Sequence, residues 1–174
     1  ENQSAAGPLY PIIHSAASSI TEMDAPAIRW VNFICLILVI GLIALTLKQH
    51  VEYSPWIGAL TIISVPFLWP AVGLALTEMP ALLAFSGFIF CVSTILTNEN
   101  EESPRELLAW AALAGVALGV SILGRQTYLI ILPAVAALCY TSPKNRVLWI
   151  LCLLTTAMTC GWLFILWGGL VPPI

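Results

Sequence analysis

Charged residues are scarce in this 174-residue chain: they occupy 9% of the positions, whereas hydrophobic residues occupy 60%. A soluble domain has roughly 25% charged residues, and a fold of this length cannot hide so much apolar surface from water. The composition therefore excludes a soluble globular protein and indicates a polytopic membrane protein. Only six residues are Lys or Arg and the net charge is -3, which argues against nucleic acid as a partner.

Motifs of soluble catalytic sites are also missing. The chain has no P-loop, no GxSxG, no HExxH and no zinc-ligand spacing. Its five cysteines lie in apolar runs, without CxxC spacing or a nearby histidine. We therefore expect the cysteines neither to bind a metal nor to form a disulfide framework, and we interpret them as lipid-facing or packing residues.

Neither end of the chain has the features of a natural terminus. The sequence starts with ENQSAAGPLYP, without an initiator Met or the basic n-region of a signal peptide, and it stops at WGGLVPPI. We therefore expect a fragment of a longer membrane protein.

Long apolar runs between short polar segments predict an all-α fold, a polytopic transmembrane helical bundle. Residues 1–26 are mixed in polarity, and we expect an extracytoplasmic loop with a short interfacial helix. Residues 27–174 are expected to form the transmembrane domain, with about six spanning or partly spanning helices. Their approximate bounds are 27–47, 55–76, 80–96, 104–123, 127–140 and 147–167.

Prolines, glycines and a capping pattern add local expectations. Pro66 and Pro70 cannot donate backbone hydrogen bonds, so the second helix should kink or end early there. The run from Ser103 to Glu106, SPRE, predicts a capping box. The Gly115/Gly119 pair is a GxxxG motif, which permits close helix contact. The fifth run is short for a hydrocarbon core of about 30 Å, so we expect a tilted or partial span.

The distribution of basic residues predicts an orientation. Six spans would place both chain ends on one side of the membrane, and on that side the basic residues are Arg29 and Arg125. The positive-inside rule makes the opposite side cytoplasmic, so the chain ends face the non-cytoplasmic side. The positive-inside rule does not account for basic residues on the non-cytoplasmic side, so a functional role is the better explanation for Arg29 and Arg125. The basic side carries Lys48, His50, Arg105, Lys144 and Arg146.

Arg125 is the single charged residue between Glu106 and Lys144, within the run AGVALGVSILGRQTYLIILP at 114–133. A charge at bilayer depth costs at least ~2–3 kcal/mol, so Arg125 must reach water, pair or bind something. In the expected topology it shares the outer face with Glu78. A guanidinium offers a bidentate fork for phosphate, and a carboxylate could act as a base, bind a metal or hold a sugar hydroxyl. A mutual ion pair is the alternative.

Other outer-face residues complete the set of candidates. Tyr10 and His14 stand four residues apart and would share one face of a short helix. Arg29 is a candidate ligand, with an interfacial anchor as the alternative interpretation, and Gln126 directly follows Arg125. The candidate substrate-binding residues are thus Arg125, Glu78, Tyr10, His14, Arg29 and Gln126.

Three stretches resemble the multi-spanning glycosyltransferases of the C superfamily, which use a polyprenyl-phosphate sugar as donor and include mannosyl-, arabinosyl- and glucosyltransferases. GPLYPIIH followed by PAIRWVN is similar to a PPLYYLL … R-x-x-N run of that family. LTEMPALLAF is similar to the acid-plus-small-residue start of a later span. The run at 114–133 is similar to the family's G-L-x-x-G-L-A-x-L-x-R run.

The resemblance implies transfer of a sugar from a polyprenyl-phosphate carrier to a lipid, protein or glycan acceptor on the non-cytoplasmic face of a bacterial inner or ER-like membrane. It implies that Arg125 contacts the donor phosphate and that Glu78 shapes the sugar site, or a divalent-metal site in a full-length enzyme. In that family the acidic catalytic base follows a first span that this chain lacks. We therefore expect the base upstream of residue 1 and an inactive fragment, with membrane lipid and the lipid-linked sugar as partners.

Two other functions stay open on the sequence alone. A transporter or channel module is one, because proline-broken helices such as the run around Pro66 and Pro70 occur at transport sites. A non-catalytic membrane subunit is the other. A transporter should carry ionisable groups near the bilayer midplane, whereas here the charges fall at the ends of the expected spans, which favours a surface-facing site.

Overall fold

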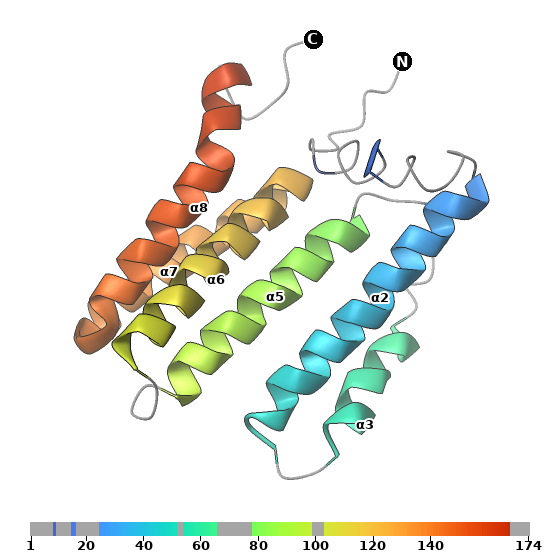
Figure 1. The fold of residues 1–174 in the computed structure, drawn as a ribbon, viewed down its shortest axis with the longest axis horizontal. Coiled ribbons are helices and arrows are strands. Elements are labelled where there is room, and N and C mark those ends of the chain that lie inside the picture. The colour runs from blue at the N-terminus through green and yellow to red at the C-terminus, as the bar shows by residue number, and fades with distance from the viewer. Residues whose placement is uncertain are drawn as a thin grey trace.

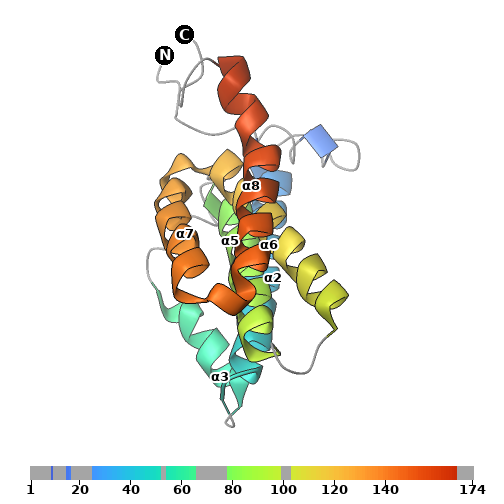
Figure 2. The same ribbon diagram turned by 90° about the vertical axis from the view of Figure 1, so that its left-hand side faces the viewer.

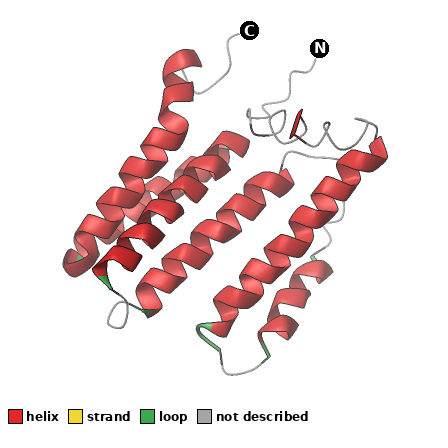
Figure 3. Cartoon of the chain, in the orientation of Figure 1, coloured by secondary structure: helices red, strands yellow, loops and turns green. Residues whose placement is uncertain are grey.

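The computed structural model describes residues 9, 15–16, 25–51, 54–65, 78–98 and 103–167. These residues form helices and loops only, without a strand (Figure 3), so the expected all-α bundle is confirmed. The α-helices are α2 (Ala25–Lys48), α3 (Pro55–Leu60), α5 (Glu78–Thr97), α6 (Pro104–Gly124), α7 (Leu132–Thr141) and α8 (Arg146–Trp167). Short 3₁₀ helices are η1 (Thr61–Ser64), η2 (Gln126–Ile131) and η3 (Pro143–Asn145).

Four long helices lie side by side in the order α2, α5, α6, α8 (Figure 1). The shorter α3 packs beside α2 and α7 packs beside α8, both on the same side of this row (Figure 2). α2 and α5 run in one direction, and α6 and α8 run in the opposite direction. The first residues of α2 and α5 therefore lie at the same end of the bundle as the last residues of α6. We call this the Glu78 end and the other the Arg105 end.

Three of the described helices are long and apolar enough to cross a membrane, over Arg29–Lys48, Glu78–Thr97 and Pro104–Gly124. Their outward faces are apolar too: Ile34, Ile37 and Leu38 of α2 are all exposed. Such a face is unfavourable in water and is solvated by lipid acyl chains. Length, composition and exposed surface together indicate membrane association.

Four of the six expected spans correspond to long helices, namely α2, α5, α6 and α8. The run expected over 55–76 differs, because α3 ends at Leu60 and η1 ends at Ser64. Pro66 explains an early end, since a proline lacks an N–H and disfavours α-helical backbone at the residue before it. The rest of that run, with Pro70, lies outside the described residues.

The run expected over 127–140 is divided into η2 and α7. α7 has 10 residues and is therefore about 15 Å long, half the thickness of a hydrocarbon core. η2 and α7 together occupy the run for which the sequence predicted a tilted or partial span.

The predicted capping box starts α6. The Ser103 hydroxyl accepts a hydrogen bond from the Glu106 N–H at 3.4 Å, and the Ser103 N–H donates to Glu106 Oε2 at 3.1 Å. Pro104 takes the first helical position, where its missing N–H costs nothing. These reciprocal bonds fix the start of α6 at the Arg105 end.

The predicted GxxxG contact joins α6 to α8. Gly115 and Gly119 are buried on α6, and a Cβ added to Gly119 would lie 2.6 Å from Thr159 Cβ on α8. The Thr156 hydroxyl lies 3.0 Å from the Gly115 carbonyl oxygen and 2.8 Å from that of Cys152. The glycines thus let the two backbones approach closely enough for a hydrogen bond between helices.

Candidate functional site

Arg125 occupies the junction between α6 and η2. Its backbone is extended, with φ -153° and ψ 116°. Its N–H donates to the Ser121 carbonyl at 2.8 Å, and its own carbonyl accepts from the Tyr128 N–H at 3.1 Å. These bonds end α6 and begin η2, so Arg125 stands at the Glu78 end of the bundle.

Gly124 brings the end of α6 against the start of α5. A Cβ added to Gly124 would lie 2.7 Å from Ala81 Cβ and 2.9 Å from Leu9 Cδ2. A glycine is therefore required for this approach, and it sets the distance between Arg125 and the first turn of α5. Leu9 is itself buried, so part of the GPLYPIIH segment also packs on the Glu78 end.

Arg125 and Glu78 form an ion pair between Nη1 and Oε1, which is the mutual pairing that the sequence analysis gave as the alternative to ligand binding. The Arg125 side chain is 44% exposed and that of Glu78 is 24% exposed. An ion pair this accessible to solvent contributes only about 0–1 kcal/mol to stability. Glu78 Oε2 is buried and has no hydrogen-bond partner in the described part of the chain, so the pair leaves part of the carboxylate unused.

Tyr128 is a third member of the site that the sequence analysis did not select. It lies within electrostatic reach of both Arg125 and Glu78, and its ring packs on Phe85 of α5 with 4.9 Å between the centroids. The signal that could have found it is its position three residues after Arg125, one 3₁₀ turn along the chain, where its N–H donates to the Arg125 carbonyl.

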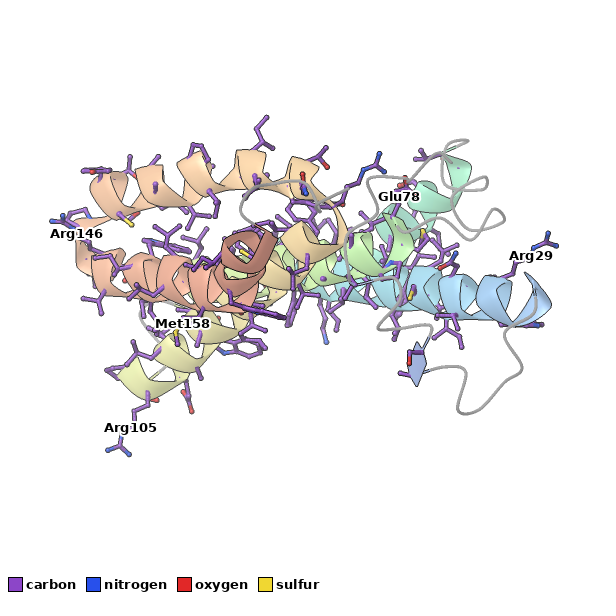
Figure 4. All side chains as sticks on the ribbon, turned by 90° about the horizontal axis from the view of Figure 1, so that it is seen from above. Arg29, Glu78, Arg105, Arg146 and Met158 are labelled. Atoms are coloured by element: carbon purple, nitrogen blue, oxygen red, sulfur yellow. The ribbon has the colours of Figure 1, made fainter. Side chains whose placement is uncertain are left out.

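The remaining candidates separate into three groups. Arg29 is exposed, and Figure 4 shows its side chain extending away from Glu78, as an interfacial anchor would. Gln126 is the first residue of η2 and is adjacent to Arg125. Tyr10 and His14 lie outside the described residues.

Asn32 of α2 is a buried polar residue that the sequence analysis did not list as a candidate. Its side chain is 0% exposed, and neither its Oδ1 nor its Nδ2 has a hydrogen-bond partner among the described residues. An unsatisfied buried polar group costs about 1–3 kcal/mol. Two further buried side-chain atoms of the described segments lack a partner: Glu78 Oε2, at the same end of the bundle, and Trp149 Nε1, near the start of α8.

A second polar cluster joins α2 to α5 at the Arg105 end. The Ser93 hydroxyl donates to Gln49 Oε1 at 2.5 Å, and the Gln49 amide donates to the Thr94 hydroxyl at 2.9 Å. His50 Nε2 lies 2.7 Å from the same Ser93 oxygen. In this arrangement the Ser93 proton is directed to Gln49, which leaves the Ser93 oxygen to accept a hydrogen bond from the N–H tautomer of His50. This cluster holds the two helices together and is not a nucleophilic site.

Within the described segments, no group of three or more His, Cys, Asp or Glu side chains could hold a metal ion. No family model, curated protein or solved structure matches this chain. The likeness of its three stretches to glycosyltransferases thus stays a prediction, and the geometry around Arg125 and Glu78 is the observation on which a function can be argued.

We expect Gly124→Val to lower the melting temperature of the detergent-solubilised protein. The added side chain would meet Ala81 and Leu9, and overpacking of this kind costs about 1–3 kcal/mol. Gly41→Val is the matched control, because a Cβ at Gly41 meets nothing within 4 Å. Equal melting temperatures for the two variants would show that α6 does not need this close approach.

Proposed function

We propose that this protein is a membrane-embedded glycosyltransferase, or the part of one that binds a polyprenyl-phosphate sugar. The observation that carries the proposal is the Arg125–Glu78 ion pair, which is partly exposed at one end of an apolar bundle. A sugar acceptor, whether lipid, protein or glycan, would approach the same end.

The phosphate of the donor would bind Arg125. The ion pair with Glu78 engages Nη1, and a guanidinium has five N–H donors in a planar fork that suits phosphate. Arg125 follows the last residue of a helix long enough to span a membrane, so in a membrane it would lie at the depth of the lipid headgroups. A polyprenyl phosphate would therefore bring its charge to Arg125 while its chain stays among the acyl chains.

The sugar of the donor would lie against Glu78. The buried Oε2 atom lacks a partner in the described segments and can accept a hydrogen bond from a sugar hydroxyl. Tyr128, within electrostatic reach of both charges, would border the same space. The acidic base of the reaction is not assigned to Glu78, because the family resemblance assigns that role to an earlier loop.

The charge distribution supports a site on the non-cytoplasmic face. Figure 4 shows Arg105 and Arg146 at one end of the bundle and Glu78 and Arg29 at the other. With about six full or partial crossings, the positive-inside rule would put the Arg105 end in the cytoplasm. The Glu78 end and both chain ends would then face outward.

A transporter or channel module is the second candidate function. The observation that favours it is the break between α6 and η2 beside Arg125, since interrupted helices occur at transport sites. Against it, the described charges lie at helix ends, where they suit a surface site better than a pathway through the membrane.

Both candidates can be tested in membranes from cells that produce the protein. Incubated with radiolabelled polyprenyl-phosphate hexose and pentose donors, these membranes should release the sugar to an acceptor faster than membranes without the protein. Movement of intact donor across the bilayer without sugar transfer would favour the transporter. Absence of both transfer and donor binding would count against the whole proposal.

A further inference from the structure

The Glu78 end of the bundle holds few positive charges. The chain has six Lys and Arg residues in all, and every one of them lies in the described segments. Those at the Arg105 end are Lys48, Arg105, Lys144 and Arg146. The other two are Arg125, which pairs with Glu78, and Arg29, whose side chain extends away from Glu78 (Figure 4). Among the Lys and Arg residues of the chain, Arg125 alone therefore balances the charge of Glu78.

Each charge of this pair lies at the helix end that favours it. Glu78 is the first residue of α5, and a helix N-terminus carries a partial positive charge. Arg125 directly follows the last residue of α6, where the partial charge of the helix is negative. The two helix ends thus stabilise the ionised forms of both side chains, and the pair as a whole has no net charge.

An anion bound to Arg125 would lie close to the Glu78 carboxylate. Glu78 Oε1 pairs with Arg125 Nη1, and the guanidinium has further N–H groups for a phosphate. Hydrogen bonds of about 2.8 Å to one guanidinium keep two anions within a few ångströms of each other. The Glu78 side chain is only 24% exposed, so solvent and salt screen its charge in part. Each negative charge of the ligand is therefore attracted by Arg125 and repelled by Glu78.

The two lipids that such a site would meet differ in charge. The phosphate of the donor is a diester with a single negative charge. During transfer the bond between the sugar C1 and the phosphate oxygen breaks with its electron pair on that oxygen, C1 bonds to the acceptor oxygen, and the acceptor proton passes to a base. The carrier is then a phosphomonoester, whose charge near neutral pH is about -1.5 to -2. The product thus carries more negative charge than the donor.

We infer that Glu78 is a charge-selectivity residue, which keeps the dianionic bare carrier from binding more tightly than the monoanionic donor. The inference rests on the proposed function and deepens it, because it gives Glu78 a role toward the phosphate besides its contact with the sugar. An arginine alone would favour the dianion and retain the product of transfer. The carboxylate beside it cancels this preference, so the spent carrier can leave. Glu78 takes no part in bond breaking.

Glu78→Gln tests the inference with two probes, polyprenyl phosphate and its methyl diester, bound to the protein in lipid nanodiscs at about pH 7.5. Neither probe carries a sugar, so the sugar contact of Glu78 does not contribute. The wild type should bind the two probes with dissociation constants within about threefold of each other. Glu78→Gln should bind the phosphomonoester about tenfold more tightly than the diester, since the repulsion of its second charge is lost.

A purely structural role for Glu78 would give a different pattern. It would weaken both probes equally, through a displaced Arg125 side chain, and that result overturns the inference. An unchanged ratio of the two dissociation constants in Glu78→Gln also overturns it, while the proposed function remains. If the wild type binds neither probe, the inference and the proposed function both fall.

Three further variants complete the design. Glu78→Asp keeps the charge and should show the wild-type ratio. Glu106→Gln is the matched control, because it makes the same substitution at the Arg105 end and a glutamine retains the capping box. A preference for the phosphomonoester in either of these variants overturns the inference. Glu78→Ala replaces the glutamine variant if that one fails to fold, and it must show the same shift of the ratio for the inference to stand.

Discussion

A leucine in place of Gly115 is expected to separate α6 from α8 and to prevent the bundle from folding. A Cβ at this position would overlap the Thr155 hydroxyl and the Cys152 carbonyl oxygen, and would lie 3.0 Å from the Cys152 carbonyl carbon. Overpacking costs about 1–3 kcal/mol where side chains can yield, and a helix backbone yields less. We therefore expect loss of the monodisperse protein in gel filtration of detergent extracts.

Gly161→Leu is the control for this substitution. It adds the same side chain to α8, at a glycine where a Cβ meets nothing within 4 Å, and it should behave like the wild type. If Gly115→Leu also gives a monodisperse protein with the wild-type melting temperature, the packing of α6 on α8 described above is wrong.

The helices that the sequence predicted well are those whose signals are local. An apolar run of the right length, a capping sequence such as Ser103 to Glu106 and the GxxxG pair each specify structure within about one or two turns. The ends of α5 and α6 followed from the same kind of pattern. The division of the fifth run at Ile131 was not predicted, although Pro133 in the first turn of α7 is a local signal for a helix start there.

Only the two charged residues of the candidate site were identified from the sequence. Charge counting selected Arg125 and Glu78 as members of one face, and the structure pairs them. The packing role of Gly124 was not predicted. A glycine is needed there because Ala81 and Leu9 lie against it in the folded bundle. Asn32 was likewise not selected as a candidate, although it is the asparagine of the quoted R-x-x-N run, because the sequence does not show that its side chain is buried.

Arg125→Gln is expected to weaken binding of polyprenyl phosphate strongly while it leaves stability nearly unchanged. Hydrogen bonds to charged groups contribute about 1.5–3 kcal/mol each, so losing the guanidinium should raise the dissociation constant by about 10- to 100-fold. Stability should change little, because the ion pair with Glu78 is partly exposed to solvent. Melting temperature and lipid binding together separate these two effects.

The dissociation constant of polyprenyl phosphate, measured in nanodiscs for the wild type, Arg125→Gln and Arg29→Gln, tests the central claim most directly. Arg29 is the matched control, an exposed arginine at the same end whose side chain extends away from Glu78 (Figure 4). We expect weakened binding for Arg125→Gln and wild-type binding for Arg29→Gln. Equal dissociation constants for all three proteins would show that the Arg125–Glu78 pair is a structural ion pair and not a phosphate site.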